Sequence, residues 1–91
     1  MQKISGEKVR QVINEMARFE WDCYIPESTV QTLVNYAEHG WQPGSFITAV
    51  LENNLAMAAS SADAENRRYL ANIAMVVEMT GLNRLYQSSK Q

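Results

Sequence analysis

The sequence has one cysteine, one histidine, and no Lys or Arg between Arg18 and Arg67. Cys23 cannot form an internal disulfide and lacks a C-x-x-C partner, so we expect it to pack as a small hydrophobic side chain. His39 belongs to no H-x-x-x-H pair, so we predict no metal site and no cofactor. Catalysis needs a nucleophile or an acid–base pair held together, and the carboxylates here are scattered singly. The sequence therefore predicts a non-enzymatic protein.

Long hydrophobic runs are also missing. The first residues contain no apolar segment typical of a secretion signal, and the longest uncharged run, 39–51, is interrupted by glycine and proline. We therefore expect no membrane span and a cytoplasmic location. A chain of 91 residues buries roughly 60–65% of its unfolded surface in one core, which predicts a single domain over residues 1–91.

Apolar residues recur at the three- and four-residue spacing of an α-helix in four segments. The predicted helices lie near 6–20, 27–39, 44–60 and 62–80. Ser5 suits the N-cap of the first, Pro26 the start of the second and Gly40 its end. Gly81 is expected to end the fourth, and residues 82–91 to add one short turn before fraying. Because no alternating strand pattern is present, the sequence predicts an all-α four-helix bundle.

The third predicted helix is nearly uncharged, since Glu52 is the only charged residue in 44–60. Two adjacent asparagines, Asn53 and Asn54, interrupt its apolar sequence and oppose helix formation by several tenths of a kcal/mol each. We therefore expect at least one of them to be hydrogen-bonded across an interface or to a neighbouring helix. A small bundle has difficulty covering such a helix alone, so the same segment favours self-association.

A family resemblance covers about half of the chain. It rests on Ile25, Pro26, Thr29, His39, Gly40, Pro43, Gly44, Phe46, Ala49, Val50, Leu51, Asn53, Leu55, Ala62, Asp63 and Asn66. Through these positions, residues 25–70 resemble a family of short, largely uncharacterised proteins encoded in bacteriophage and prophage genomes. The family pattern has an aspartate where this chain has Asn54. The resemblance implies a viral or prophage origin and no biochemical activity.

The segment HGWQPGSF, residues 39–46, has two interpretations. In the first it is the elbow of a helical hairpin, in which Gly40 ends one helix, Pro43 opens the next and Trp41 covers the joint. We favour this interpretation, because any pair of consecutive antiparallel helices needs such a connector.

In the second interpretation the same segment binds an anion. Free N–H groups at Gly44 and Ser45 can hold a phosphate or carboxylate, Trp41 can stack on a ring, and Arg67 or Arg68 can neutralise the charge. The alternative function is then a protein that sequesters a small anionic ligand such as a nucleotide.

Nucleic-acid binding is the second alternative. The two central helices can be drawn as a helix-turn-helix with SFITAVLENNL as the recognition helix. That helix contains no Arg or Lys and its flanks are acidic, so the attraction to phosphate that supplies most affinity is missing. The sequence therefore argues against DNA binding through this hairpin.

Protein–protein interaction is the function that the composition favours most. The chain has two tryptophans, four tyrosines and five methionines, and these residue types are enriched at the centres of interfaces. The residues that we single out for interaction are Trp21, Trp41, Asn53, Asn54 and Tyr69. The sequence thus predicts a homo-oligomer that also binds a host or phage protein, although these side chains can equally belong to the core of a monomer.

Overall fold

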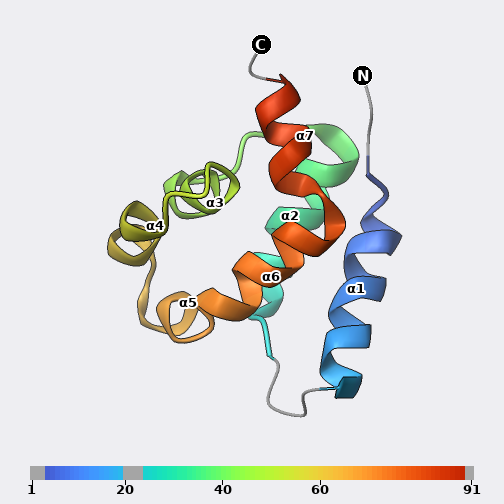
Figure 1. The fold of residues 1–91 in the computed structure, drawn as a ribbon, viewed down its shortest axis with the longest axis horizontal. Coiled ribbons are helices and arrows are strands. Elements are labelled where there is room, and N and C mark those ends of the chain that lie inside the picture. Colours follow the sequence, from blue (N-terminus) through green and yellow to red (C-terminus); the bar gives the residue numbers. More distant parts are fainter. Residues whose placement is uncertain (1–3, 20–23, 90–91) are drawn as a thin grey trace.

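The computed structural model describes residues 4–19 and 24–89, and every regular element in these ranges is an α-helix (Figure 1). The helices are α1 (Gly6–Phe19), α2 (Glu27–His39), α3 (Ser45–Leu51), α4 (Leu55–Ser61), α5 (Ala64–Arg68), α6 (Leu70–Thr80) and α7 (Leu82–Ser89). The all-α prediction is confirmed. The predicted number of four helices is corrected, because the third and fourth are each divided in two and a further helix follows Gly81.

The first two helices have the ends that the sequence predicts. The Ser5 hydroxyl accepts a hydrogen bond from the Lys8 N–H at 3.1 Å, which is the N-cap of α1. Helix α2 begins directly after Pro26, and it ends at Gly40, whose φ of 70° is left-handed. Local signals at these positions were therefore sufficient to place both helices.

The break between α3 and α4 falls on the two adjacent asparagines. Asn53 has a φ of 62°, a left-handed conformation that asparagine tolerates better than most residues, so the right-handed helix stops there. The Asn54 side chain accepts a hydrogen bond from the Met57 N–H at 3.2 Å and caps α4. Both asparagines are exposed. The prediction that they lie inside one continuous helix is therefore corrected.

The segment predicted as 62–80 is also divided. The Asp63 carboxylate accepts the Asn66 N–H at 2.8 Å and caps α5. Tyr69 separates α5 from α6 with a φ of −107°, and Gly81, with a φ of 82°, ends α6 as predicted. Residues 82–89 form α7, a longer helix than the single turn expected, because Leu82, Asn83 and Tyr86 are buried.

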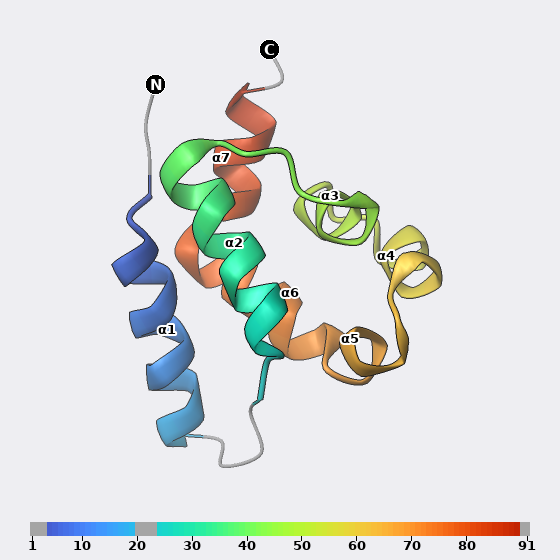
Figure 2. The same ribbon diagram turned by 180° about the vertical axis from the view of Figure 1, so that it is seen from behind.

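The core lies where α6 meets its neighbours. Helix α6 packs against α1, α3 and α7, and α1 also packs against α2. The largest fully buried side chains are Val9, Leu33, Leu51, Ile73, Val76, Val77 and Leu82. The Tyr86 hydroxyl donates to the Glu52 carboxylate at 3.0 Å, which ties α7 to the end of α3. Figure 2 shows α2 and the connector to α3 from the opposite side.

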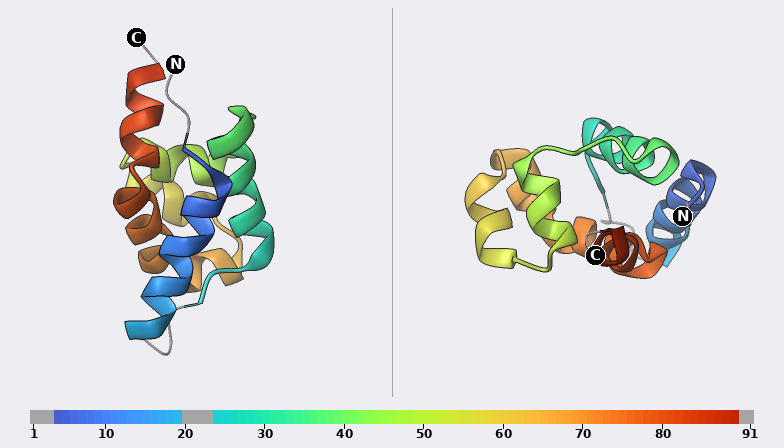
Figure 3. Two further views of the ribbon diagram at one scale, coloured as in Figure 1. Left: turned by 90° about the vertical axis from the view of Figure 1, so that its right-hand side faces the viewer. Right: turned by 90° about the horizontal axis from the view of Figure 1, so that it is seen from above.

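The molecule is flat, with dimensions of 36 × 28 × 18 Å. Figure 3 shows α3 and α4 at one end of the molecule and α1 at the other. Every helix carries at least one exposed residue. Within residues 4–19 and 24–89, no helix has the length and hydrophobicity that crossing a membrane requires.

Candidate functional site

The connector between α2 and α3 presents Trp41 to solvent. Its side chain is 60% exposed, and its indole stacks on the His39 imidazole with ring centroids 4.7 Å apart and planes 27° apart. The His39 Nε2 lies 3.8 Å from a Glu38 carboxylate oxygen. Gly40 makes the turn as the elbow interpretation requires. Trp41, however, stacks on the last residue of α2 and remains largely exposed.

The residues predicted to hold an anion have separate surroundings. Gly44 is the exposed residue before α3, with Ser45 the first residue of that helix. The Arg67 guanidinium donates to the carbonyls of Ala59 and Ala62, each at 3.1 Å, and so satisfies acceptors at the C-terminal end of α4. These contacts give Arg67 a structural role in the α4–α5 region.

A pair of tyrosines joins two distant parts of the chain. The rings of Tyr24 and Tyr69 meet edge to face at 5.0 Å, and the Asn72 amide donates to the Tyr24 carbonyl at 3.1 Å. Arg68 lies 5.6 Å from the centre of the Tyr69 ring, a cation–π arrangement. The contacts of Tyr69 fasten the segment before α2 to the junction of α5 and α6, while Tyr24 stays 49% exposed.

The residues predicted for interaction lie on different parts of the chain. Trp41 follows α2, the two asparagines lie between α3 and α4, and Tyr69 packs within the chain. Trp21 lies outside the described residues, as does Cys23.

Four exposed apolar side chains on helices were missed by the sequence analysis. Leu55 and Met57 on α4 are 57% and 53% exposed, and Met75 and Met79 on α6 are 47% and 50% exposed. The sequence pattern of α6 indicates that Met75 and Met79 are exposed. Ile73, Val76, Val77 and Thr80 form its buried side, and Met75 and Met79 are spaced four residues apart outside it.

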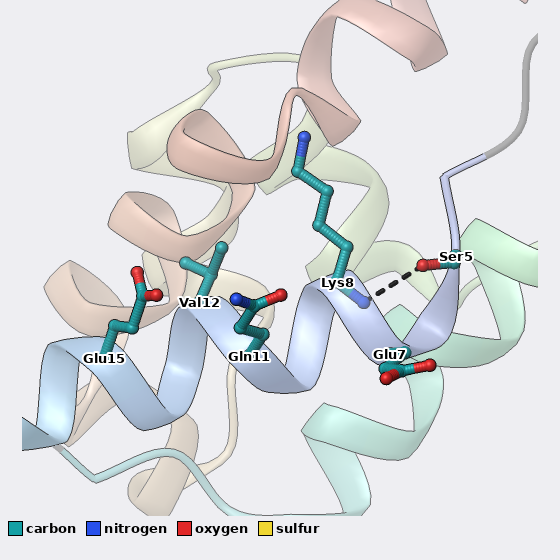
Figure 4. Close-up of a pocket in the computed structure, with 6 residues that line it drawn as sticks. All are labelled: Ser5, Glu7, Lys8, Gln11, Val12 and Glu15. Atoms are coloured by element: carbon teal, nitrogen blue, oxygen red, sulfur yellow. Dashed lines mark hydrogen bonds between the residues drawn. The ribbon is translucent and has the colours of Figure 1, made fainter.

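An open depression of about 320 Å³ runs along α1 and is lined by Ser5, Glu7, Lys8, Gln11, Val12 and Glu15. In Figure 4, Lys8, Val12 and Glu15 extend from α1 toward the side on which α6 and α7 lie. Every lining residue comes from α1 or its N-cap, so this is a surface hollow along one helix. No group of metal-ligating side chains occurs among residues 4–19 and 24–89.

The corner between α6 and α7 carries a charged pair. Glu78 Oε2 lies 2.7 Å from the Arg84 guanidinium, and Asn83 donates to the other carboxylate oxygen at 3.1 Å. These bonds, chiefly the one from Arg84, lower the pKa of Glu78 below its ordinary value of 4.5. The lowered pKa keeps the Glu78 carboxylate charged to a lower pH than an isolated glutamate.

Comparison with family models, with curated proteins and with solved structures finds no match for this chain.

Proposed function

We propose that this chain is a non-enzymatic protein that works by binding other proteins, among them a second copy of itself. On this proposal it is encoded by a bacteriophage or prophage, as the resemblance of residues 25–70 implies. It then acts in the cytoplasm of the host cell on a host or phage protein.

The exposure of large apolar side chains supports the proposal. Six of them are about half exposed or more, namely Tyr24, Trp41, Leu55, Met57, Met75 and Met79. Tyr, Trp and Met are the types that interface cores favour, and a partner that covers them removes apolar area from water. The third predicted helix gives no further support to self-association, because Ile47, Val50 and Leu51 of α3 are buried within the monomer.

Sedimentation velocity over a range of micromolar concentrations tests the proposal. We expect a species heavier than the 10.3 kDa monomer whose fraction grows with concentration. If the protein sediments as a monomer at every concentration tested, the proposed self-association is refuted. Melting curves with added nucleotide or phosphate serve as a second measurement, since a saturable rise in melting temperature would favour the anion-binding alternative.

A further inference from the structure

Helix α6 carries an apolar stripe on its outward side. Ala71, Met75 and Met79 follow one another at four-residue spacing, and all three are exposed. Residues at this spacing lie one above the other on a helix, and the stripe extends for about 12 Å at 1.5 Å per residue. Its length is that of a short helix–helix contact.

Helix α1 packs against α6. The edge of α1 that carries Gly6 and Arg10 faces α2, because the Gly6 N–H donates to Glu38 and Arg10 contacts Glu27. Lys8, Val12 and Glu15 therefore lie on the edge nearer to α6, in agreement with their direction in Figure 4. Helices α1 and α6 pack together and run in opposite directions in Figure 1. The α1–α6 face is defined here as Lys8, Val12, Glu15, Ala71, Met75 and Met79.

The charges beside the apolar stripe are balanced. Lys8 and Glu15 on α1 have opposite signs, and so do Glu78 and Arg84 at the corner of α6 and α7. A surface that binds its own copy must be complementary to itself, because the same patch is used by both subunits. A face with an apolar centre and equal charges of both signs meets that condition, whereas a face of one sign repels its copy.

From these features we infer that a second copy of the chain docks on the α1–α6 face about a two-fold axis that passes close to Met75. This inference rests on the proposed self-association and names its surface. Lys8 and Glu15 are about 10 Å apart along α1, so an axis at the level of Val12 brings Lys8 of one copy toward Glu15 of the other. Met75 and Met79 of one copy then pack against Met75 and Met79 of the other, and their flexible side chains adapt to the contact.

Helix α4 does not offer an equivalent stripe. Leu55 and Met57 are two residues apart, so their side chains point to nearly opposite sides of the helix. The exposed Trp41 is already stacked on His39 and has no apolar neighbour four residues away on its connector. The α1–α6 face is thus the surface that best fits a second copy.

Sedimentation equilibrium of Met75→Glu, with Met57→Glu as the matched control, tests the inference. The two methionines are exposed to similar degrees on different helices, so both variants are expected to fold, which circular dichroism checks. Met75→Glu should weaken dimerisation by more than about 30-fold, the effect of a central interface residue, and Met57→Glu should leave it unchanged. A dimer that survives Met75→Glu and dissociates in Met57→Glu would overturn the inference and leave the proposed self-association intact.

Charge reversal tests the relation between the two copies. Lys8→Glu should weaken the dimer by placing like charges together, and Lys8→Glu combined with Glu15→Lys should restore it. Failure of the double variant to restore the dimer would overturn the two-fold arrangement. A wild-type chain that is monomeric throughout would instead refute the proposed self-association, and the inference with it.

Discussion

Gly6 lies where the beginning of α1 approaches the end of α2, and replacing it with alanine should destabilise the protein. A Cβ atom at Gly6 would lie 2.7 Å from Cγ1 of Val34 and would also collide with the Glu38 carboxyl group. Val34 is buried in α2 and cannot move away. Glu38 can swing outward, but it would then release the Gly6 N–H, whose hydrogen bond to Glu38 measures 3.1 Å.

The expected loss follows from these two contacts. Forcing an extra methyl group into a packed site costs about 1–3 kcal/mol. Loss of the hydrogen bond adds roughly 1 kcal/mol, because the partly exposed Glu38 side chain is also hydrated. The higher helix propensity of alanine returns up to about 1 kcal/mol. The net destabilisation is about 1–3 kcal/mol, which corresponds to a fall in melting temperature of roughly 5–20 °C for a domain of this size.

Thermal unfolding followed by circular dichroism measures this change, with Glu38→Ala as the second arm of a double-mutant cycle. In the Glu38→Ala background one of the two obstacles is gone, so Gly6→Ala should cost less there than in the wild type. A Gly6→Ala variant as stable as the wild type would refute the close approach of α1 and α2. Equal costs in the two backgrounds would refute the role of Glu38.

Substitutions at four further positions test other features of the structure. Asn54→Ala should lower the free energy of unfolding by about 1 kcal/mol through loss of the α4 cap, and an unchanged denaturation midpoint would contradict that role. Asn53→Ala should cost about 1–2 kcal/mol in the same assay, because alanine resists a left-handed φ, while Asn53→Gly should cost nothing. Trp41→Ala should change stability by less than about 0.5 kcal/mol, since the side chain is 60% exposed, and a larger loss on chemical denaturation would contradict its placement. Because the pKa of Glu78 is lowered in the folded state, its contribution to stability is full above its ordinary pKa of 4.5 and is lost as the pH falls through the lowered value. Unfolding curves at pH 7 and pH 3 should show a smaller acid-induced loss in Arg84→Ala than in the wild type, and equal losses would disprove the linkage.

The ends of α1, α2 and α6 were predictable because their signals are local. A serine hydroxyl at Ser5 and glycines at Gly40 and Gly81 act on the backbone within a few residues. The separation of α3 from α4 was also encoded locally, by Asn53 and Asn54. Their low helix propensity is explained by a left-handed residue at Asn53 and an N-cap at Asn54.

Other features depend on contacts that no local pattern encodes. Tyr69 separates α5 from α6 without glycine or proline, and its ring contacts Tyr24, which is far away in the sequence. Whether Trp41 is covered depends on where α3 lies relative to α2, which the composition of the connector does not determine. The exposure of Met75 and Met79 could have been predicted from the sequence. Ile73, Val76 and Val77 form the buried side of α6, and the helical spacing places the two methionines on another side.

The bonds of Arg67 have a consequence for how the chain opens. The only buried residues among 55–68 are Ala58 and Ala62, so little apolar packing holds this stretch against the rest of the protein. The guanidinium of Arg67 closes this stretch on itself, and a side-chain hydrogen bond between Thr29 and Asn66 attaches it to α2. Local unfolding of such a segment requires much less free energy than unfolding of the core. We therefore expect its amide protons to exchange with solvent while the helices around Leu33 and Ile73 remain closed, and proteases to cleave within this stretch first.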